Sequence, residues 1–102
     1  GIYVANCPGK NANAVSELTI GLMISIDRRM AEQNELLKQG KWCKGNFVNQ
    51  KGLKDRTLGI MGFGAIGQRV CKAALAMEMK VLVCSRTKKE GLDTEMGFTF
   101  AD

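Results

Sequence analysis

The sequence predicts an α/β fold in which a long helix precedes part of a parallel β-sheet. Two short apolar runs, Thr57–Met61 and Lys80–Cys84, have the length and composition of buried parallel strands. A glycine-rich turn and a helical repeat of apolar residues lie between these runs, which is the order of a strand–helix–strand unit. The chain has 102 residues, of which 45% are hydrophobic and 25% charged. This composition is typical of one globular domain at most, and it excludes disordered and collagen-like proteins.

The N-terminal part of the chain combines a short extended segment with helical periodicity. Residues 2–9 are expected to form a β-type run and a turn. We expect residues 11–40 to form one helix, which begins at Asn11 or Asn13 and ends at Gly40. Packing in the core is the simpler interpretation of its apolar face, and a subunit interface is the alternative, because a helix that is apolar on most sides needs cover. The residues of this face recur every three or four positions: Val15, Leu18, Leu22, Ile26 and Met30.

The net charge of +5 is concentrated in residues 38–56, which connect the long helix to the first strand. Asp55 is the one acidic residue among the lysines and arginines of this segment, and Trp42 and Phe47 are expected to anchor it. Basic residues interleaved with aromatic ones occur on nucleic-acid-binding surfaces. Because the segment contains no recognition motif, we expect a solvated loop and no nucleic-acid partner.

The strongest functional motif is the G-x-G-x-x-G sequence from Gly62 to Gly67, which directly follows the first strand. Gly62 permits a tight turn, Gly64 lets the backbone approach a pyrophosphate, and Gly67 lets the next helix pack closely on the strand. Free N–H groups at the start of that helix bind an anion. A second strand follows within about 30 residues, so the sequence predicts a Rossmann-type sheet that binds NAD or NADP. The helix between the strands has one apolar face: Ile66, Val70, Ala74 and Met77.

The end of the second strand usually selects between the two cofactors. An acidic side chain there bonds the ribose of NAD and repels the 2′-phosphate of NADP. Ser85 occupies this position, and Arg86 and Thr87 follow; we assign all three to the cofactor site. Ser85 removes the repulsion and Arg86 offers a planar fork that suits a phosphate, so the residue chemistry favours NADP. In the alternative, Ser85 hydrogen-bonds the ribose of NAD and Arg86 covers the adenine.

Composition excludes several other kinds of site. The chain contains no histidine, so it carries no histidine-dependent proton relay, and we assign no catalytic residue in it. Its four cysteines form no C-x-x-C pair, so we expect no metal site, and free, buried thiols in a reducing compartment. The longest almost uncharged apolar stretch, residues 18–26, is shorter than the roughly 20 residues that span a bilayer. We therefore expect a cytoplasmic protein without a membrane partner.

One long stretch of sequence carries a resemblance to a known family. The run Leu58-Gly-Ile-Met-Gly-Phe-Gly-Ala-Ile-Gly67 is followed by thirteen residues and then by Val81-Leu-Val-Cys-Ser85. This pattern resembles the nucleotide-binding signature of the D-isomer-specific 2-hydroxyacid dehydrogenases, and the resemblance extends over nearly the whole chain. The Asn-Cys-Pro-Gly sequence that ends at Gly9 and the Ser-Arg-Thr end of the second strand are similar to the phosphoglycerate dehydrogenase subgroup of that family.

The resemblance implies a domain organisation and further cofactor contacts. Residues 1–9 would be the crossover from a substrate domain outside the chain, and residues 10–102 the N-terminal part of the NAD(P)-binding domain. In the family two such domains pair into a homodimer, partly through the long helix. Ala65 and Ile66 would contact the cofactor beside the three glycines. Ala65 stands where many family members have a basic residue, and Ser85 stands where an acidic residue is usual.

The resemblance also implies a reaction, the transfer of a hydride between a 2-hydroxy acid and a nicotinamide dinucleotide. The substrate would be 3-phosphoglycerate, in serine biosynthesis. A glyoxylate or hydroxypyruvate reductase is the alternative among enzymes, and a non-catalytic, dinucleotide-sensing, corepressor-like protein is the alternative outside them. The family's catalytic histidine, glutamate and arginine fall in segments that this sequence does not contain. Residues 98–102 indicate a short strand followed by a helix N-cap at Asp102, so we expect a fragment of a longer protein.

Overall fold

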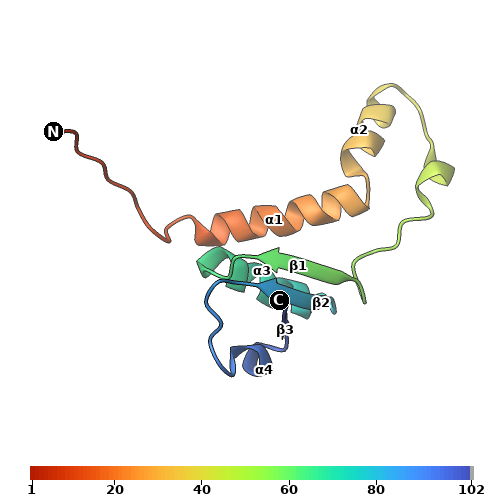
Figure 1. Ribbon diagram of the computed structural model, residues 1–102. Helices are drawn as coiled ribbons and strands as arrows, with labels where there is room; N and C mark the ends of the chain where they lie inside the picture. Colours follow the sequence, from red (N-terminus) through yellow and green to blue (C-terminus); the bar gives the residue numbers. More distant parts are fainter. Residues whose placement is uncertain (102) are drawn as a thin grey trace.

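The computed structural model describes residues 1–101, which form a small parallel sheet with helices on one side and an extended N-terminal segment (Figure 1). None of the helices in this part of the chain is long and apolar enough to cross a membrane. The elements in chain order are α1 (Ala12–Asp27), α2 (Met30–Lys38), the short 3-10 helix η1 (Lys44–Phe47), β1 (Thr57–Met61), α3 (Ala65–Ala76), β2 (Lys80–Cys84), α4 (Leu92–Met96) and β3 (Thr99–Phe100).

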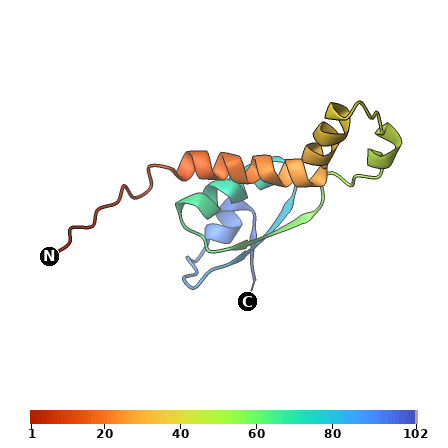
Figure 2. The same cartoon turned by 90° about the horizontal axis from the view of Figure 1, so that it is seen from above.

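The predicted parallel sheet is confirmed. β1, β2 and β3 lie side by side in this order, and each neighbouring pair is parallel. β1 and β2 have the bounds that the apolar runs predict, and their last residues, Met61 and Cys84, are paired in register. The short C-terminal strand is β3, whereas Asp102, the expected N-cap, lies outside the described residues. Figure 2 shows α3 and α4 on the same side of the strands, the arrangement that right-handed crossovers between successive parallel strands produce.

The hydrophobic core lies between α3 and one face of the sheet. Alternate strand residues point into it, so Ile60, Val81 and Val83 are buried while their neighbours in the strands are exposed. On the opposite face Met61 is 89% exposed and Leu82 is 40% exposed. Within the described residues, therefore, the sheet is packed on one face. The core residues that α3 contributes are Val70, Cys71 and Ala74.

The prediction of a single helix over residues 11–40 is wrong in one respect, because the structure has two helices there with a break between them. Between α1 and α2, Arg29 adopts a left-handed conformation with a φ of 51°. The side chains of Gln33 and Gln50 donate hydrogen bonds to the carbonyl of Arg28. They satisfy an acceptor that the interruption removes from the helical hydrogen-bond pattern.

The two ends of this helical region agree with the prediction. Asn11 is the N-cap residue of α1, although its side chain makes no capping hydrogen bond. Gly40 follows α2 with a φ of 73° and donates its N–H to the carbonyl of Leu37. A glycine in this left-handed conformation is a common end of a helix.

The apolar face predicted for the long helix does not lie in the core. Leu18, Leu22 and Ile26, which we call the α1 stripe, are 63%, 53% and 75% exposed. α1 instead packs against α3 and the core through another face, on which Ala12 and Ser16 are buried and Ile20 and Met23 are half-buried. The core interpretation is therefore wrong for this stripe. Contiguous exposed apolar side chains of this kind are typical of an interaction surface.

The N-terminal segment and the cysteines also differ from expectation. Residues 2–5 form no strand, because the segment lies against no other strand of the described chain, and Tyr3 is fully exposed. All four cysteines are free, as expected, but Cys71 alone is buried. Cys7 and Cys84 are exposed, so the expectation of buried thiols is wrong for both.

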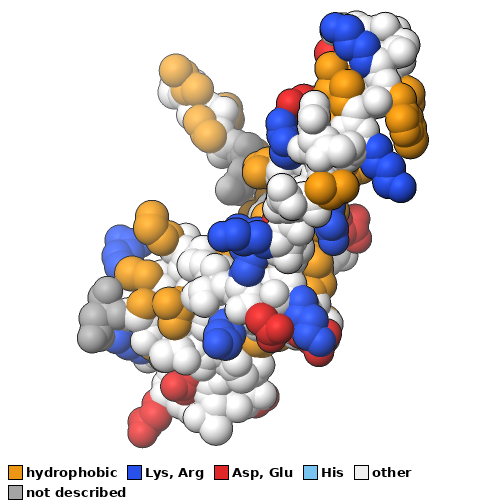
Figure 3. Space-filling model, turned by 90° about the vertical axis from the view of Figure 1, so that its right-hand side faces the viewer, with side chains coloured by type: hydrophobic (Ala, Val, Ile, Leu, Met, Phe, Trp, Pro, Cys, Tyr) orange, Lys and Arg blue, Asp and Glu red, His pale blue; other side chains and the backbone are white. Residues whose placement is uncertain are grey.

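Residues 29–48, here called the arm, project from the body of the molecule. The guanidinium of Arg29 donates to both carboxylate oxygens of Glu32 and to the carbonyl of Asn46, and it lies 4.6 Å from the centre of the Phe47 ring. Figure 3 shows basic and hydrophobic side chains interspersed over the arm. The Cα radius of gyration is 17.8 Å, compared with about 13 Å for a compact domain of this length. The segment of residues 38–56 is largely an exposed loop, as expected, and it contains the short helix η1.

Candidate dinucleotide-binding site

The glycine loop begins where β1 ends. Gly62 has a φ of 91°, a conformation that residues with a side chain rarely adopt, so the chain turns sharply out of the strand. The N–H of Gly62 donates to the carbonyl of Cys84 at 2.8 Å, which ties the loop to the end of β2. Because Met61 and Cys84 are paired, Gly62 and Ser85 are the first residues beyond two neighbouring strands. The structure thus brings the two halves of the predicted cofactor site together.

The other two glycines of the motif have contrasting surroundings. A Cβ atom at Gly67 would lie 2.5 Å from the carbonyl oxygen of Gly62, so any side chain there would push α3 away from the loop. A Cβ atom at Gly64 would meet no other atom within 4 Å. Packing inside the protein therefore requires Gly67, whereas the space beside Gly64 is open to a ligand.

The N-terminus of α3 is suited to an anion. Gly64 is its N-cap residue, no side chain makes a capping hydrogen bond, and its first turn has no acidic residue. The first N–H groups of an α-helix have no acceptor within the helix, and they carry a partial positive charge. Ala65 and Ile66 form the start of this turn, and the Ile66 side chain is 37% exposed. A phosphate placed here would meet backbone donors without a competing carboxylate.

A cavity of about 520 Å³ lies beside the glycine loop. The loop, β1 and the first turn of α3 line it, and so do the N-cap residue Asn11 and the α1 residues Ala12, Thr19 and Met23. Sequence reasoning missed the contribution of α1, because the packing of α1 against α3 is a tertiary contact that leaves no mark on residue spacing. The cavity does not extend to Ser85, Arg86 or Thr87, which form a separate surface beyond the end of β2.

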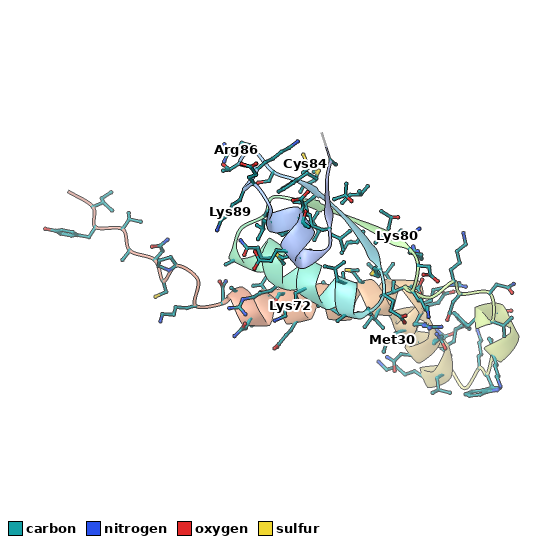
Figure 4. All side chains as sticks on the ribbon, turned by 90° about the horizontal axis from the view of Figure 1, so that it is seen from below. Met30, Lys72, Lys80, Cys84, Arg86 and Lys89 are labelled. Atoms are coloured by element: carbon teal, nitrogen blue, oxygen red, sulfur yellow. The ribbon has the colours of Figure 1, made fainter. Side chains whose placement is uncertain are left out.

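That second surface is accessible and positively charged. Ser85 is half-buried, and Arg86 and Thr87 are exposed. Figure 4 shows Arg86 and Lys89 near Cys84 at the carboxyl end of β2, far from Lys80 at its other end. Within residues 1–101 the guanidinium of Arg86 has no hydrogen bond or ion pair, so all its donors are available to a ligand.

The remaining chemistry of the described chain is limited. No group of three or more histidine, cysteine or acidic side chains among residues 1–101 could hold a metal ion. Burial raises the pKa of the Cys71 thiol, so this thiol stays protonated and unreactive near neutral pH. The donors that this site offers are consequently backbone N–H groups and cationic side chains, which bind and orient an anionic ligand.

A second cavity, of about 660 Å³, lies on the arm. Leu36, Trp42 and Phe47 are among the residues that line it. Phe47 anchors this segment beneath Arg29, as predicted, whereas Trp42 is 79% exposed and does not anchor it. The arm follows the end of α1, whereas the glycine loop lies beside the start of α1. This cavity is therefore separate from the cofactor site.

Parallel strands joined by a helix, a glycine loop tied to the second strand and an uncapped helix N-terminus define a dinucleotide-binding domain of the Rossmann type. Comparison with known proteins narrows this class. Residues 20–102 match the NAD binding domain of the D-isomer specific 2-hydroxyacid dehydrogenases. The chain belongs to this family of oxidoreductases, as the sequence resemblance suggested.

Two curated relatives illustrate the relationship. The chain is 38% identical over 109 residues to a glyoxylate reductase of Thermococcus litoralis, an alignment that covers 100% of this chain and 33% of the relative. It is 46% identical over 90 residues to a hydroxypyruvate reductase of Thermotoga maritima, covering 88% of this chain and 29% of the relative. The chain thus spans about a third of the length of these relatives. They are reductases of small 2-oxo acids by name, so the finer likeness to phosphoglycerate dehydrogenase is not supported.

Solved structures confirm the fold. A protein from Pyrococcus horikoshii superposes with a TM-score of 0.86 at 27% identity, covering 99% of this chain and 32% of that one. A glyoxylate reductase from Paecilomyes thermophila superposes with a TM-score of 0.82 at 28% identity, covering 100% of this chain and 30% of that one. The α/β, Rossmann-type architecture predicted from the sequence is therefore shared with known dehydrogenases.

Proposed function

We propose that this chain is the cofactor-binding part of an enzyme that transfers a hydride between a nicotinamide dinucleotide and a small 2-hydroxy acid, with glyoxylate or hydroxypyruvate as the preferred 2-oxo substrate. The glycine loop carries this proposal. Its backbone is open at Gly64, and the uncapped start of α3 lies directly beyond it. Residues 1–9 would then be the crossover from a substrate domain, and residues 10–102 the first part of the cofactor domain.

Each part of the site has a binding role in this proposal. Gly62, Gly64 and Gly67 shape the loop so that backbone N–H groups, including those of Ala65 and Ile66, hold the pyrophosphate. The nicotinamide of the bound dinucleotide supplies or accepts the hydride. The side chains after β2 hold the adenosine end: Ser85, Arg86 and Thr87. The proton relay and the cation that holds the substrate carboxylate would come from the family's histidine, glutamate and arginine outside this chain.

NADP(H) is the cofactor that the end of β2 favours. Ser85 is neutral and therefore does not repel a 2′-phosphate, and the guanidinium of Arg86, which has no partner among residues 1–101, can donate to two phosphate oxygens. NAD(H) remains the alternative, with Ser85 bonded to the ribose hydroxyls. We expect the protein to bind NADPH at least tenfold more tightly than NADH, since one charge-assisted hydrogen bond contributes about 1.5–3 kcal/mol.

The substrate preference is supported by the two relatives, which are named as a glyoxylate reductase and a hydroxypyruvate reductase. 3-Phosphoglycerate is the second candidate, and the Asn-Cys-Pro-Gly segment ending at Gly9 together with the Ser-Arg-Thr sequence from Ser85 favours it. A dinucleotide sensor without catalysis is the third candidate, since the described residues contain a binding site alone.

A substrate and cofactor panel tests the proposal. The full-length protein that contains this chain is supplied with glyoxylate, hydroxypyruvate or 3-phosphohydroxypyruvate, each with NADPH or NADH, and absorbance at the reduced nicotinamide band is followed. We expect the largest kcat/KM with glyoxylate or hydroxypyruvate and NADPH. Largest turnover with 3-phosphohydroxypyruvate would establish the second candidate. Dinucleotide binding without turnover of any of the three would establish the sensor, and absence of binding would overturn the proposal altogether.

A further inference from the structure

Three aromatic rings form a continuous cluster at the carboxyl end of the sheet. Phe63 belongs to the glycine loop, Phe98 precedes β3, and Phe100 is the last residue of β3. The ring centres of Phe63 and Phe98 are 4.8 Å apart, and those of Phe98 and Phe100 are 5.0 Å apart with the planes at 85°. Such tilted and edge-to-face pairs are favourable geometries for aromatic rings. We call these three residues the aromatic cluster.

The aromatic cluster extends to a cation in the loop after β2. The ammonium of Lys88 lies 5.9 Å from the centre of the Phe100 ring, within the roughly 6 Å over which a cation is attracted to an aromatic face. Lys88 follows Ser85 by three positions, so it belongs to the same loop as the proposed adenosine contacts. One aromatic path therefore connects the glycine loop with this loop.

Backbone hydrogen bonds fix both ends of this path. The N–H of Ala101 donates to the carbonyl of Val83 at 2.8 Å, which holds the end of β3 against β2. The N–H of Gly62 donates to the carbonyl of Cys84 at 2.8 Å, which holds the glycine loop against the same strand. In addition, Phe98 is only 6% exposed, so the middle ring is locked by packing. The position of the Phe100 ring relative to the glycine loop is consequently determined by the fold.

A 2′-phosphate has enough charge to attract more than one cation. It carries a charge of about −2 at neutral pH, whereas Arg86 contributes a single positive charge. Lys88 is the cation of this loop that the structure places against a fixed ring. A long lysine side chain loses rotamer freedom when it binds a ligand, and contact with the ring reduces that loss by restricting the side chain beforehand.

We infer that Lys88 is the second cation of the 2′-phosphate site, and that Phe100, held by Phe63 and Phe98, is the residue that positions it. This inference rests on the proposed function and specifies how the NADP(H) preference is built. Arg86 supplies the hydrogen-bonding fork, Lys88 supplies charge, and the aromatic cluster keeps that charge at a constant place relative to the pyrophosphate. Phe100 acts through Lys88, so it is a positioning residue.

The experiment measures dinucleotide affinity in the full-length protein by titration calorimetry, with NADPH, NADH, 2′,5′-ADP and 5′-AMP as ligands. Lys88→Ala should raise the Kd of NADPH and of 2′,5′-ADP about tenfold, the loss expected for one charge-assisted contact. Phe100→Leu should raise the same constants about two- to fivefold, the size of an exposed cation–aromatic contact. Neither variant should change the Kd of NADH or 5′-AMP, because these ligands lack the 2′-phosphate.

Conservative and matched variants separate positioning from folding. Phe100→Tyr keeps the ring and should bind NADPH like the unaltered protein, and Lys88→Ala combined with Phe100→Leu should bind no more weakly than Lys88→Ala alone. Lys89→Ala removes the same charge from the neighbouring position and should have a clearly smaller effect. Phe47→Leu removes the ring beneath Arg29 on the arm and should leave every Kd unchanged.

The outcomes distinguish this inference from the function on which it rests. Equal weakening of NADH and NADPH binding in Phe100→Leu would assign the ring to the fold alone and overturn the inference. If Lys88→Ala and Lys89→Ala weakened NADPH binding equally, the effect of Lys88 would be that of overall positive charge alone. The inference would then be overturned as well. Unaltered protein that prefers NADH would overturn the inference while leaving the dehydrogenase proposal intact. Unaltered protein that binds no dinucleotide would overturn both.

Discussion

Gly64 and Gly67 are three positions apart, at the N-cap and in the first turn of α3, yet a methyl group added to each would have opposite consequences. At Gly67 it would collide with the backbone of the loop itself, since the Gly62 carbonyl oxygen lies 2.5 Å from the position of the added carbon. At Gly64 it would enter open space. The two glycines therefore allow the contributions of folding and of ligand binding to be separated by substitution.

We expect Gly64→Ala to raise the Kd of the dinucleotide at least tenfold without changing the thermal unfolding temperature, because the methyl group obstructs the approach of the pyrophosphate. Gly67→Ala should instead lower the free energy of unfolding by about 1–3 kcal/mol, as overpacking does. Calorimetric titration and thermal unfolding measure the two effects. Gly45→Ala is the matched control, because that position is equally open and lies on the arm. Tight dinucleotide binding by Gly64→Ala would contradict the proposed site.

At the scale of single elements, the break between α1 and α2 determines where the arm points. Arg29 combines a left-handed backbone with the contacts that hold η1 to α2. Its ion pair with Glu32 is about half exposed, and exposed pairs contribute less than about 1 kcal/mol to stability. The side chain therefore orders the arm more than it stabilises the whole fold.

We expect Arg29→Ala to accelerate amide hydrogen exchange in η1 several-fold while lowering the free energy of unfolding by about 1 kcal/mol or less. The reason is that the arm loses its side-chain ties, whereas the core between α3 and the sheet is untouched. Exchange measured by mass spectrometry provides the first quantity and denaturant unfolding the second. Arg69→Ala, an exposed arginine of α3, serves as control. Unchanged exchange in η1 would show that the arm is ordered by other contacts.

The elements that could be predicted are those with a local signal. β1 and β2 are apolar runs bounded by turns, and the glycine motif fixes where α3 begins. The break at Arg29 could not be predicted, because a left-handed conformation is expected of glycine and nothing in the sequence indicates it for an arginine. The packing face of α1 was hidden for another reason. Ala12, Ser16, Ile20 and Met23 form it, and because the exposed stripe is equally apolar, the hydrophobic pattern alone does not show which side packs inward.

The residues of the candidate site also differ in whether a local sequence signal predicts them. Gly62, Gly64 and Gly67 could be assigned in advance because each backbone requirement excludes a side chain, and Ser85 could be located by its distance along the chain. The lining from Asn11 and Thr19 could not, since it depends on the angle at which α1 crosses α3. Local chemistry can be predicted from a sequence, whereas contacts between elements that are distant in the chain depend on the assembled fold.

At the scale of the whole molecule, we propose that the exposed α1 stripe is the interface of the homodimer that the family resemblance implies. Leu18, Leu22 and Ile26 lie on the side of α1 that does not pack on α3. We expect Leu22→Glu to weaken dimerisation at least a hundredfold, because a buried unpaired carboxylate costs several kcal/mol. Sedimentation velocity over a range of concentrations measures the dimer Kd. Thr94→Glu adds the same charge on the exposed surface of α4 and should leave the dimer intact, and a dimer unaffected by Leu22→Glu would exclude this helix as the interface.

The hydrogen bond from the Gly62 N–H to the Cys84 carbonyl has a consequence for how cofactor preference can evolve. It joins main-chain atoms, so most substitutions leave it in place, and the distance between the two halves of the site is inherited unchanged. The loop that begins at Ser85 is meanwhile largely exposed, and exposed positions tolerate exchange at small cost in stability. Descendants of this domain can therefore change from one dinucleotide to the other by altering a few loop side chains, and a protein engineer can follow the same route.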